Sequence, residues 1–130
     1  MDLQLSGKRV IVTGASKGIG LAIARAFLVE GAEVAICARN ADDLATAAAD
    51  LSTSGTVHHH IADMGVKGEP AGFVEWASDQ MGGVDIVVSN VSAMAGPDWE
   101  MSCAVDLIGM DALVRASLEK MDDHAGCNVI

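Results

Sequence analysis

The sequence predicts an α/β protein built on a parallel sheet with helices on both faces. Apolar runs too short for a stable helix alternate along the chain with longer segments whose apolar residues recur at helical spacing. This alternation indicates right-handed crossovers between parallel strands. Most of these short runs are apolar through their middle, as in strands that are buried on both faces. Apolar residues make up 51% of the 130 residues and charged residues only 20%, which favours one folded domain over disorder.

Strands and helices are expected in strict alternation, and the last residues open a fifth strand. The strands are predicted over 9–14, 33–39, 57–63, 84–90 and 127–130, and the helices over 20–32, 40–55, 68–82 and 99–122. In an open sheet of this kind, ligands bind beyond the carboxyl ends of the strands, where the strand order reverses. Functional residues are therefore expected in the loops that directly follow strands.

The first predicted helix has the spacing and the end signal of a short globular helix. Ile23, Ala26, Phe27 and Glu30 recur at helical spacing, and Gly31 is placed to cap the C-terminus.

The next two helices carry recognisable start signals. Asn40 is a suitable N-cap, Asp42 and Asp43 suit the positive end of the helix that follows it, and Gly55 comes after its end. In the third helix, Pro70 falls in the first turn, where no amide donor is required.

The last helix, 99–122, is long and carries many apolar residues: Val105, Leu107, Leu113, Val114, Leu118 and Met121.

The first strand runs directly into a loop with three glycines. Gly14, Gly18 and Gly20 stand between Thr13 and the first helix. Glycines permit a tight turn, a close approach of backbone to a pyrophosphate, and close packing of helix on strand. Amides at a helix N-terminus also attract phosphate. A plain strand-to-helix turn needs one glycine rather than three, so we expect a nucleotide site on a Rossmann-type, doubly wound parallel sheet.

Charge and hydropathy exclude several other classes of protein. The formal net charge is −10 and the sequence pI about 4.5, which argues against nucleic acid and anionic membrane as partners. No apolar run approaches the ~18 residues of a membrane span. The opening "MDLQLSGKR" lacks the layout of a signal peptide, so we expect a cytoplasmic protein.

Neither the cysteines nor the histidines predict a metal site. Cys37, Cys103 and Cys127 form no CxxC pair and are interpreted as reduced thiols, two of them buried. Three consecutive histidines occur in the third strand, where neighbouring side chains point to opposite faces. Only His58 and His60 can therefore converge, and a histidine-rich strand edge is expected instead.

Four motifs in order link the chain to a known family. Thr13 opens a Thr-Gly-x-x-x-Gly-x-Gly pattern, Asp63 ends the third strand, "DIVVSN" is followed by "VSAMAGP", and "AVDLIG" lies in the last helix. Together they resemble the short-chain dehydrogenase/reductase (SDR) family over nearly the whole chain. The resemblance implies an NAD(P)-binding Rossmann domain over 1–130 and hydride transfer between nicotinamide and a carbonyl or alcohol substrate.

The choice of nucleotide depends on the end of the second strand. An NAD site needs a carboxylate about 20 residues beyond the glycines, whereas Arg39 stands there in this sequence. A guanidinium suits the 2′-phosphate of NADP, and the resemblance implies that Lys17 reaches the same phosphate. The alternatives are that both cations are solvated, or that Asp42 or Asp43 reaches a ribose.

The resemblance also implies individual roles for the cofactor site. Asp63 would contact the adenine, and Asn90 would tie two strands beside the ribose. The full set expected to bind NADP(H) is Gly14, Ser16, Lys17, Gly18, Ile19, Gly20, Arg39, Asp63 and Asn90.

The sequence departs from the family at its catalytic residues. The family uses a serine, a tyrosine and a lysine four residues after the tyrosine, but this sequence contains no tyrosine. Asp106 occupies the position of the family's asparagine, and an ionised aspartate accepts hydrogen bonds without donating them. Ser92 stands where the family has a glycine close to the cofactor ribose.

These departures leave two functional hypotheses. The first is an NADP(H)-dependent SDR oxidoreductase seen as its cofactor-binding half, C-terminally truncated relative to an enzyme of roughly 250 residues and assembling as a homo-oligomer through the 99–122 helix. The alternative is a non-catalytic NADP(H)-binding sensor or assembly module, whose incomplete sheet is covered by a partner.

Overall fold

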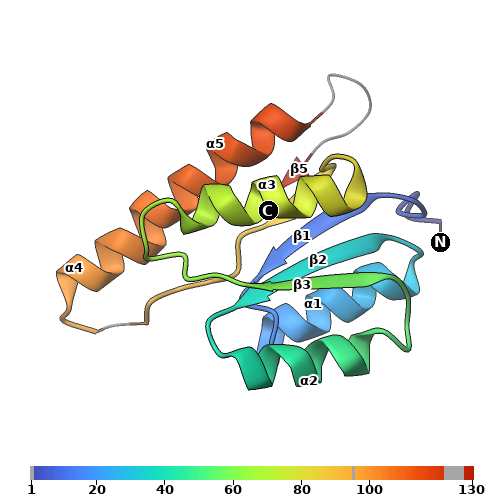
Figure 1. Ribbon diagram of the computed structural model, residues 1–130, viewed down its shortest axis with the longest axis horizontal. Helices are drawn as coiled ribbons and strands as arrows, with labels where there is room; N and C mark the ends of the chain where they lie inside the picture. Colours follow the sequence, from blue (N-terminus) through green and yellow to red (C-terminus); the bar gives the residue numbers. More distant parts are fainter. Residues whose placement is uncertain (1, 95, 122–127) are drawn as a thin grey trace.

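A computed structural model describes residues 2–94, 96–121 and 128–130 and shows one parallel sheet (Figure 1). Its strands are β1 (Arg9–Thr13), β2 (Glu33–Ala38), β3 (Val57–Ile61), β4 (Ile86–Val88) and β5 (Asn128–Val129). The order across the sheet is β3-β2-β1-β4-β5, and each neighbouring pair is parallel. The strand order therefore reverses between β1 and β4: β2 and β3 lie on one side of β1, and β4 and β5 lie on the other. The predicted doubly wound, Rossmann-type fold is confirmed.

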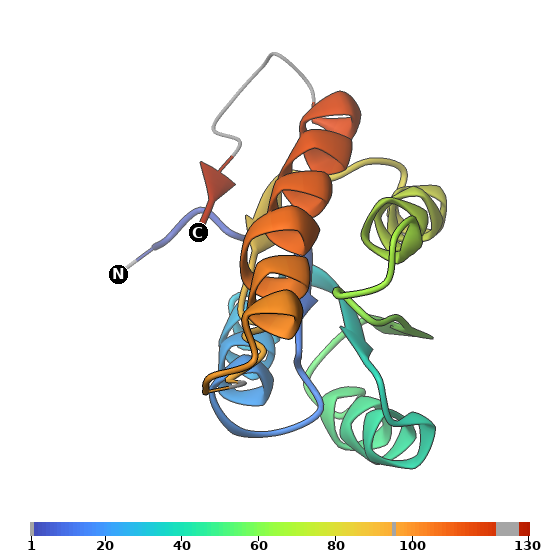
Figure 2. The ribbon, with the colours of Figure 1, turned by 90° about the vertical axis from the view of Figure 1, so that its left-hand side faces the viewer.

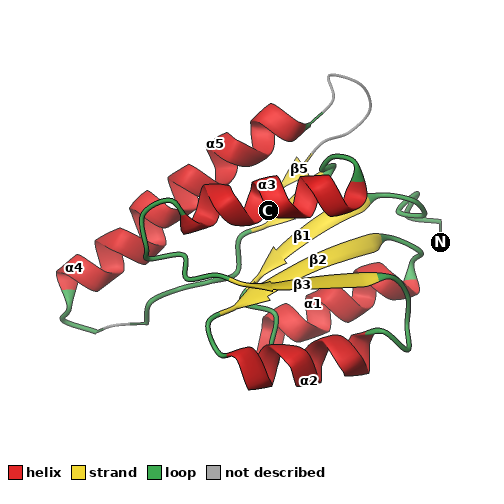
Figure 3. Ribbon diagram, viewed as in Figure 1, coloured by secondary structure: helices red, strands yellow, loops and turns green. Residues whose placement is uncertain are grey.

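Helices cover both faces of the sheet (Figures 2 and 3). The helices are α1 (Gly18–Val29), α2 (Ala41–Leu51), α3 (Glu69–Met81), α4 (Trp99–Ser102), the π-helix η1 (Cys103–Gly109) and α5 (Met110–Lys120). On one face, α1 and α2 pack on a core that includes Val10 and Val12 of β1. On the other face, α3 and α5 pack on a core that includes Ile11. Because alternate residues of β1 are buried in different cores, the middle of the strand is apolar on both faces.

The start and end signals that the sequence predicts for the helices are present in the structure. Asn40 accepts a hydrogen bond from the amide of Asp43 at 2.9 Å and so caps α2. Gly31 has a φ of +86° directly beyond the end of α1, and its amide donates to the carbonyl of Leu28. Pro70 lies in the first turn of α3.

The buried face of α1 is centred beside the residues whose helical spacing predicted the helix. The helix begins at Gly18, and its most buried larger residues are Ala24 and Leu28. Ile23 and Phe27 lie at the edge of that face and are only partly buried, and Ala26 is exposed. Residues one position apart on a helix differ by about 100° in direction, so Ala24 and Leu28 point into the core while Ile23 and Phe27 flank it.

The long helix predicted from about 99 to 122 is present, but its middle has π-helical rather than α-helical geometry. The helix widens into a π-helix over Cys103–Gly109 and its last described turn ends at Lys120, while Asp122 lies outside the described residues. At Gly109 an added Cβ would lie 2.0 Å from the carbonyl oxygen of Met64, so this segment touches the loop after β3 directly. Cys127 of the predicted last strand also lies outside the described residues.

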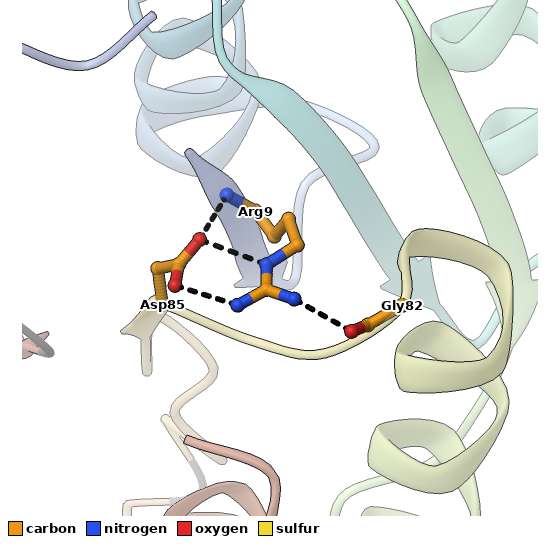
Figure 4. A network of polar contacts seen from close by, with 3 residues as sticks. All are labelled: Arg9, Gly82 and Asp85. Atoms are coloured by element: carbon orange, nitrogen blue, oxygen red, sulfur yellow. Dashed lines mark hydrogen bonds and ion pairs between the residues drawn. The ribbon is translucent and has the colours of Figure 1, made fainter. Parts of the chain in front are cut away.

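An ion pair joins the amino ends of the two central strands (Figure 4). The Arg9 guanidinium donates to both carboxylate oxygens of Asp85, at 2.9 and 2.8 Å, and to the carbonyl of Gly82. The amide of Arg9 donates to Asp85 as well. These hydrogen bonds from Arg9 lower the pKa of the Asp85 carboxyl below its usual value. Within the described part of the chain, no helix combines the length and apolar character of a membrane span.

Candidate functional site

The carboxyl ends of β1 and β4 meet at the point where the strand order reverses. Asn90 donates from its amide nitrogen to the carbonyls of Thr13 and Gly14, at 3.2 and 3.1 Å. The buried Thr13 hydroxyl accepts from the backbone amides of Asn90 and Val91. Asn90 therefore ties β1 to the segment after β4, as expected from the sequence.

The glycine loop makes a turn that other residues would strain. Gly14 and Gly18 have φ values of +64° and +59°, in the left-handed region. At Gly20, an added Cβ would lie 2.3 Å from the Gly14 carbonyl oxygen and 2.6 Å from the amide nitrogen of Asn90. The start of α1 is therefore packed tightly under its own loop.

The N-terminus of α1 faces the same edge of the sheet. Lys17 is its N-cap residue, with extended backbone and no side-chain cap hydrogen bond, and the first turn carries no acidic residue. Ser16 is half-buried, whereas Lys17 and Ile19 are exposed. The backbone amides of this turn are available to an anion because no capping side chain competes for them.

A pocket of about 180 Å³ opens beside this loop, beyond the carboxyl ends of β2, β3 and β4. Its polar wall includes Arg39 directly after β2 and Asp63 after β3. The remaining wall comes from the loops after β3 and β4 and from the last helix: Gly65, Val66, Val91, Ser92, Ala93, Met101, Ala104 and Val105.

The loop after β3 is held by its own side chain and by the last helix. Asp63 accepts a hydrogen bond from the amide of Gly65 at 2.8 Å. At Gly65, an added Cβ would lie 2.9 Å from Val105 of η1, so the two walls of the pocket are in contact there.

Asp106 fixes the opposite wall. Its Oδ1 accepts from the amide of Ala93 at 3.1 Å, which holds the loop after β4 against η1. One carboxylate oxygen is sufficient for this bond, so the aspartate keeps the acceptor function of an asparagine at this position.

The predicted site residues thus divide into two neighbouring groups. Arg39 and Asp63 line the pocket, together with Ser92. The glycine loop, Gly14 to Gly20, does not line the pocket; it forms the turn that joins β1 to α1.

The apolar wall residues were not predicted from the sequence. Val66 and Met101 are exposed apolar side chains that only the fold brings to the pocket, and no local signal in the sequence indicates them.

Cys37 of β2 and two histidines of β3 have structural roles. Burial raises the pKa of the Cys37 thiol to about 12, so the thiol stays protonated and is unreactive at neutral pH. His58 lies 2.7 Å from Glu33 and His60 stacks on Trp76, with ring centroids 4.7 Å apart. Among the described residues, no three potential metal ligands gather in one place.

Comparison with known proteins places this geometry in a family. A family profile described as "short chain dehydrogenase" matches residues 8–130. The chain belongs to the short-chain dehydrogenase family. One related protein is YvrD of Bacillus subtilis, an uncharacterised oxidoreductase. It is 42% identical to this chain over a stretch that covers 93% of this chain and 49% of YvrD.

Solved structures support the same assignment. L-sorbose reductase from Gluconobacter frateurii, complexed with NADPH and L-sorbose, superposes with a TM-score of 0.85 at 32% identity, covering 93% of this chain and 50% of the reductase. An NAD⁺-bound xylitol dehydrogenase is similar in fold, with a TM-score of 0.83 at 21% identity over 90% of this chain and 49% of that one. The chain therefore spans about half the length of the SDR proteins it matches and corresponds to their N-terminal portion.

Proposed function

We propose that this chain is the cofactor-binding half of an NADP(H)-dependent oxidoreductase that acts on a carbonyl or alcohol substrate. The observation that carries the proposal is Arg39, which follows β2 and lines the pocket where a carboxylate would be needed for NAD. A guanidinium there offers paired, charged hydrogen bonds to a 2′-phosphate. The NADPH complex of the related L-sorbose reductase is consistent with this choice.

The residues present fit a dinucleotide. The Cβ position of Gly18 is open, with no atom within 4 Å, and the first turn of α1 has no capping side chain, so the backbone of Ser16 to Gly20 can approach a pyrophosphate. Lys17 stands exposed at this turn and would add a second cation for the 2′-phosphate.

The remaining wall would hold the adenosine. Asp63 would accept from the adenine, and Val66 and Val105 would contact the ring faces, because all three line the same pocket. Asn90 would keep the loop beside the ribose in place through its bonds to β1.

When bound, the nicotinamide would supply or accept the hydride. The chain itself contains no tyrosine to move the accompanying proton, so we assign that step to residues outside this sequence. Asp106 is a positioning residue here, since it holds the amide of Ala93.

We also propose that the protein is cytoplasmic. Its Cys37 and Cys103 are free thiols in the structure, which is consistent with a reducing compartment.

The Arg39 assignment is tested with adenosine 2′,5′-bisphosphate and AMP, which differ by the 2′-phosphate. We expect Arg39→Ala to weaken the bisphosphate by about 10-fold or more, because a hydrogen bond between charged groups contributes about 1.5–3 kcal/mol. AMP affinity should change less than about threefold. The matched control is Arg115→Ala, a solvent-exposed arginine paired with Asp111 on α5. Equal losses for the two nucleotides would refute the role of Arg39.

A further inference from the structure

Asp106 carries a negative charge that its hydrogen bond does not require. Its Oδ1 accepts from the backbone amide of Ala93, a residue that lines the pocket. An asparagine oxygen would accept the same hydrogen bond without a charge. The contact with Ala93 therefore accounts for one carboxylate oxygen and leaves the charge of Asp106 unexplained.

No side chain in the described part of the chain forms an ion pair with this carboxylate. The ion pairs found there involve other acidic residues: Glu33, Asp50, Glu75, Asp85 and Asp111. Asp106 is half-buried in η1. Water and salt therefore screen its charge less than they screen a fully exposed carboxylate.

The strand order indicates which end of a bound dinucleotide would face Asp106. Arg39, proposed to hold the 2′-phosphate of the adenosine ribose, follows β2, whereas Ala93 comes after β4 on the other side of β1. The glycine loop proposed for the pyrophosphate follows β1, between them. A dinucleotide that crosses the point where the strand order reverses would therefore place its nicotinamide on the side of β4.

The two oxidation states of the cofactor differ in charge at this end of the molecule. The oxidised nicotinamide ring is positively charged and the reduced ring is neutral, while the phosphates are the same in both. We propose that Asp106 makes the site prefer the oxidised cofactor over the reduced one. This inference rests on the proposed function and deepens it, because it assigns selection of the oxidation state to one residue.

The test is a calorimetric titration of the 130-residue chain with NADP⁺ and with NADPH, for the wild type and for Asp106→Asn. The asparagine keeps the acceptor for the Ala93 amide and removes the charge. At an effective dielectric constant of about 20–40, a unit charge about 10 Å away changes an affinity by about 4- to 15-fold. We therefore expect Asp106→Asn to weaken NADP⁺ relative to NADPH by about fourfold or more.

Two further variants separate the charge of Asp106 from other effects. Asp111→Asn removes the same charge from an exposed position on α5, where Asp111 pairs with Arg115. Because that charge is already paired and screened by water, the ratio of the two Kd values should change by less than about 1.5-fold. Asp106→Glu keeps the charge, so the ratio should stay close to that of the wild type even if both affinities fall.

A purely structural role of Asp106 would weaken both cofactors by the same factor, so an unchanged ratio in Asp106→Asn would overturn the inference. An equal change of the ratio in Asp111→Asn would also overturn it, because the effect would then belong to the net charge of the protein. NAD⁺ and NADH differ by the same charge, so this comparison decides the question even if Arg39 does not hold a 2′-phosphate. Binding of none of the four cofactors would instead refute the proposed function itself.

Discussion

At the residue scale, the Asn90 side chain links the two strands that meet at the site. Its amide nitrogen serves two carbonyls at the end of β1. Asn90→Ala would leave both carbonyls without this partner, so we expect a loss of about 1–3 kcal/mol in the free energy of unfolding, measured by urea denaturation. Ser92→Ala, in the same loop, should cost less than about 0.5 kcal/mol. A loss for Asn90→Ala as small as the one expected for Ser92→Ala would show that the hydrogen bonds of Asn90 between the strands contribute little to stability.

Gly20 allows a second prediction at this scale. Its added Cβ would collide with the Gly14 carbonyl oxygen, whereas the Cβ of an alanine at position 72 in α3 would have no neighbour within 4 Å. We expect Gly20→Ala to destabilise the protein by about 1–3 kcal/mol and Gly72→Ala to stabilise it by about 0.4–1 kcal/mol. Thermal unfolding of both variants measures the contrast. A neutral Gly20→Ala would mean that α1 does not press on the loop.

At the scale of elements, the ion pair between β1 and the residue before β4 predicts a pH dependence. The folded-state pKa of Asp85 is below its usual value of 3.8 because Arg9 donates hydrogen bonds to it. Its contribution to stability is therefore complete above the unfolded-state pKa and is lost as pH falls through the folded-state pKa.

The difference in unfolding free energy between the wild type and Asp85→Asn should follow this dependence. We expect about 1–3 kcal/mol at pH 7, and a smaller difference below about pH 3.8, where the unfolded carboxyl is protonated. Urea denaturation across this range measures it. A difference that stays constant down to pH 2 would contradict the assignment.

The elements show what the sequence can and cannot predict. Short apolar strands and capped helices were recovered because Asn40, Gly31 and Pro70 act locally. The π-helical segment was not, because it coincides with a tertiary contact between Gly109 and the backbone of Met64. Such close backbone contacts leave no periodic signal in the sequence.

At the scale of the whole molecule, the same division applies to the candidate site. Arg39 and Asp63 were predicted because functional residues follow strands in a parallel sheet, and both line the pocket. Val66, Met101 and Ala104 were missed because they come together only when the last helix packs across the loops. The sequence therefore indicates the polar part of the site and not its apolar wall.

Exposed apolar side chains on the last helix predict that the protein associates with a second copy of itself. Leu107, Ile108 and Leu118 are 60%, 67% and 56% exposed on η1 and α5. We propose that a second copy covers these side chains, because exposed apolar patches of this kind mark interaction sites. Leu107→Glu should shift a dimer to monomer in sedimentation velocity, whereas Val29→Glu, on α1, should leave it a dimer. A wild-type monomer at high concentration would contradict this proposal.

The most direct test of the central claim is a fluorescence titration of the wild-type chain with NADPH and with NADH under identical conditions. The two cofactors differ only in the 2′-phosphate, which Arg39 and Lys17 are proposed to hold. We expect NADPH to bind with a Kd about 10-fold or more below that of NADH, as charged hydrogen bonds to one phosphate would give. Equal Kd values, or tighter binding of NADH, would contradict the account.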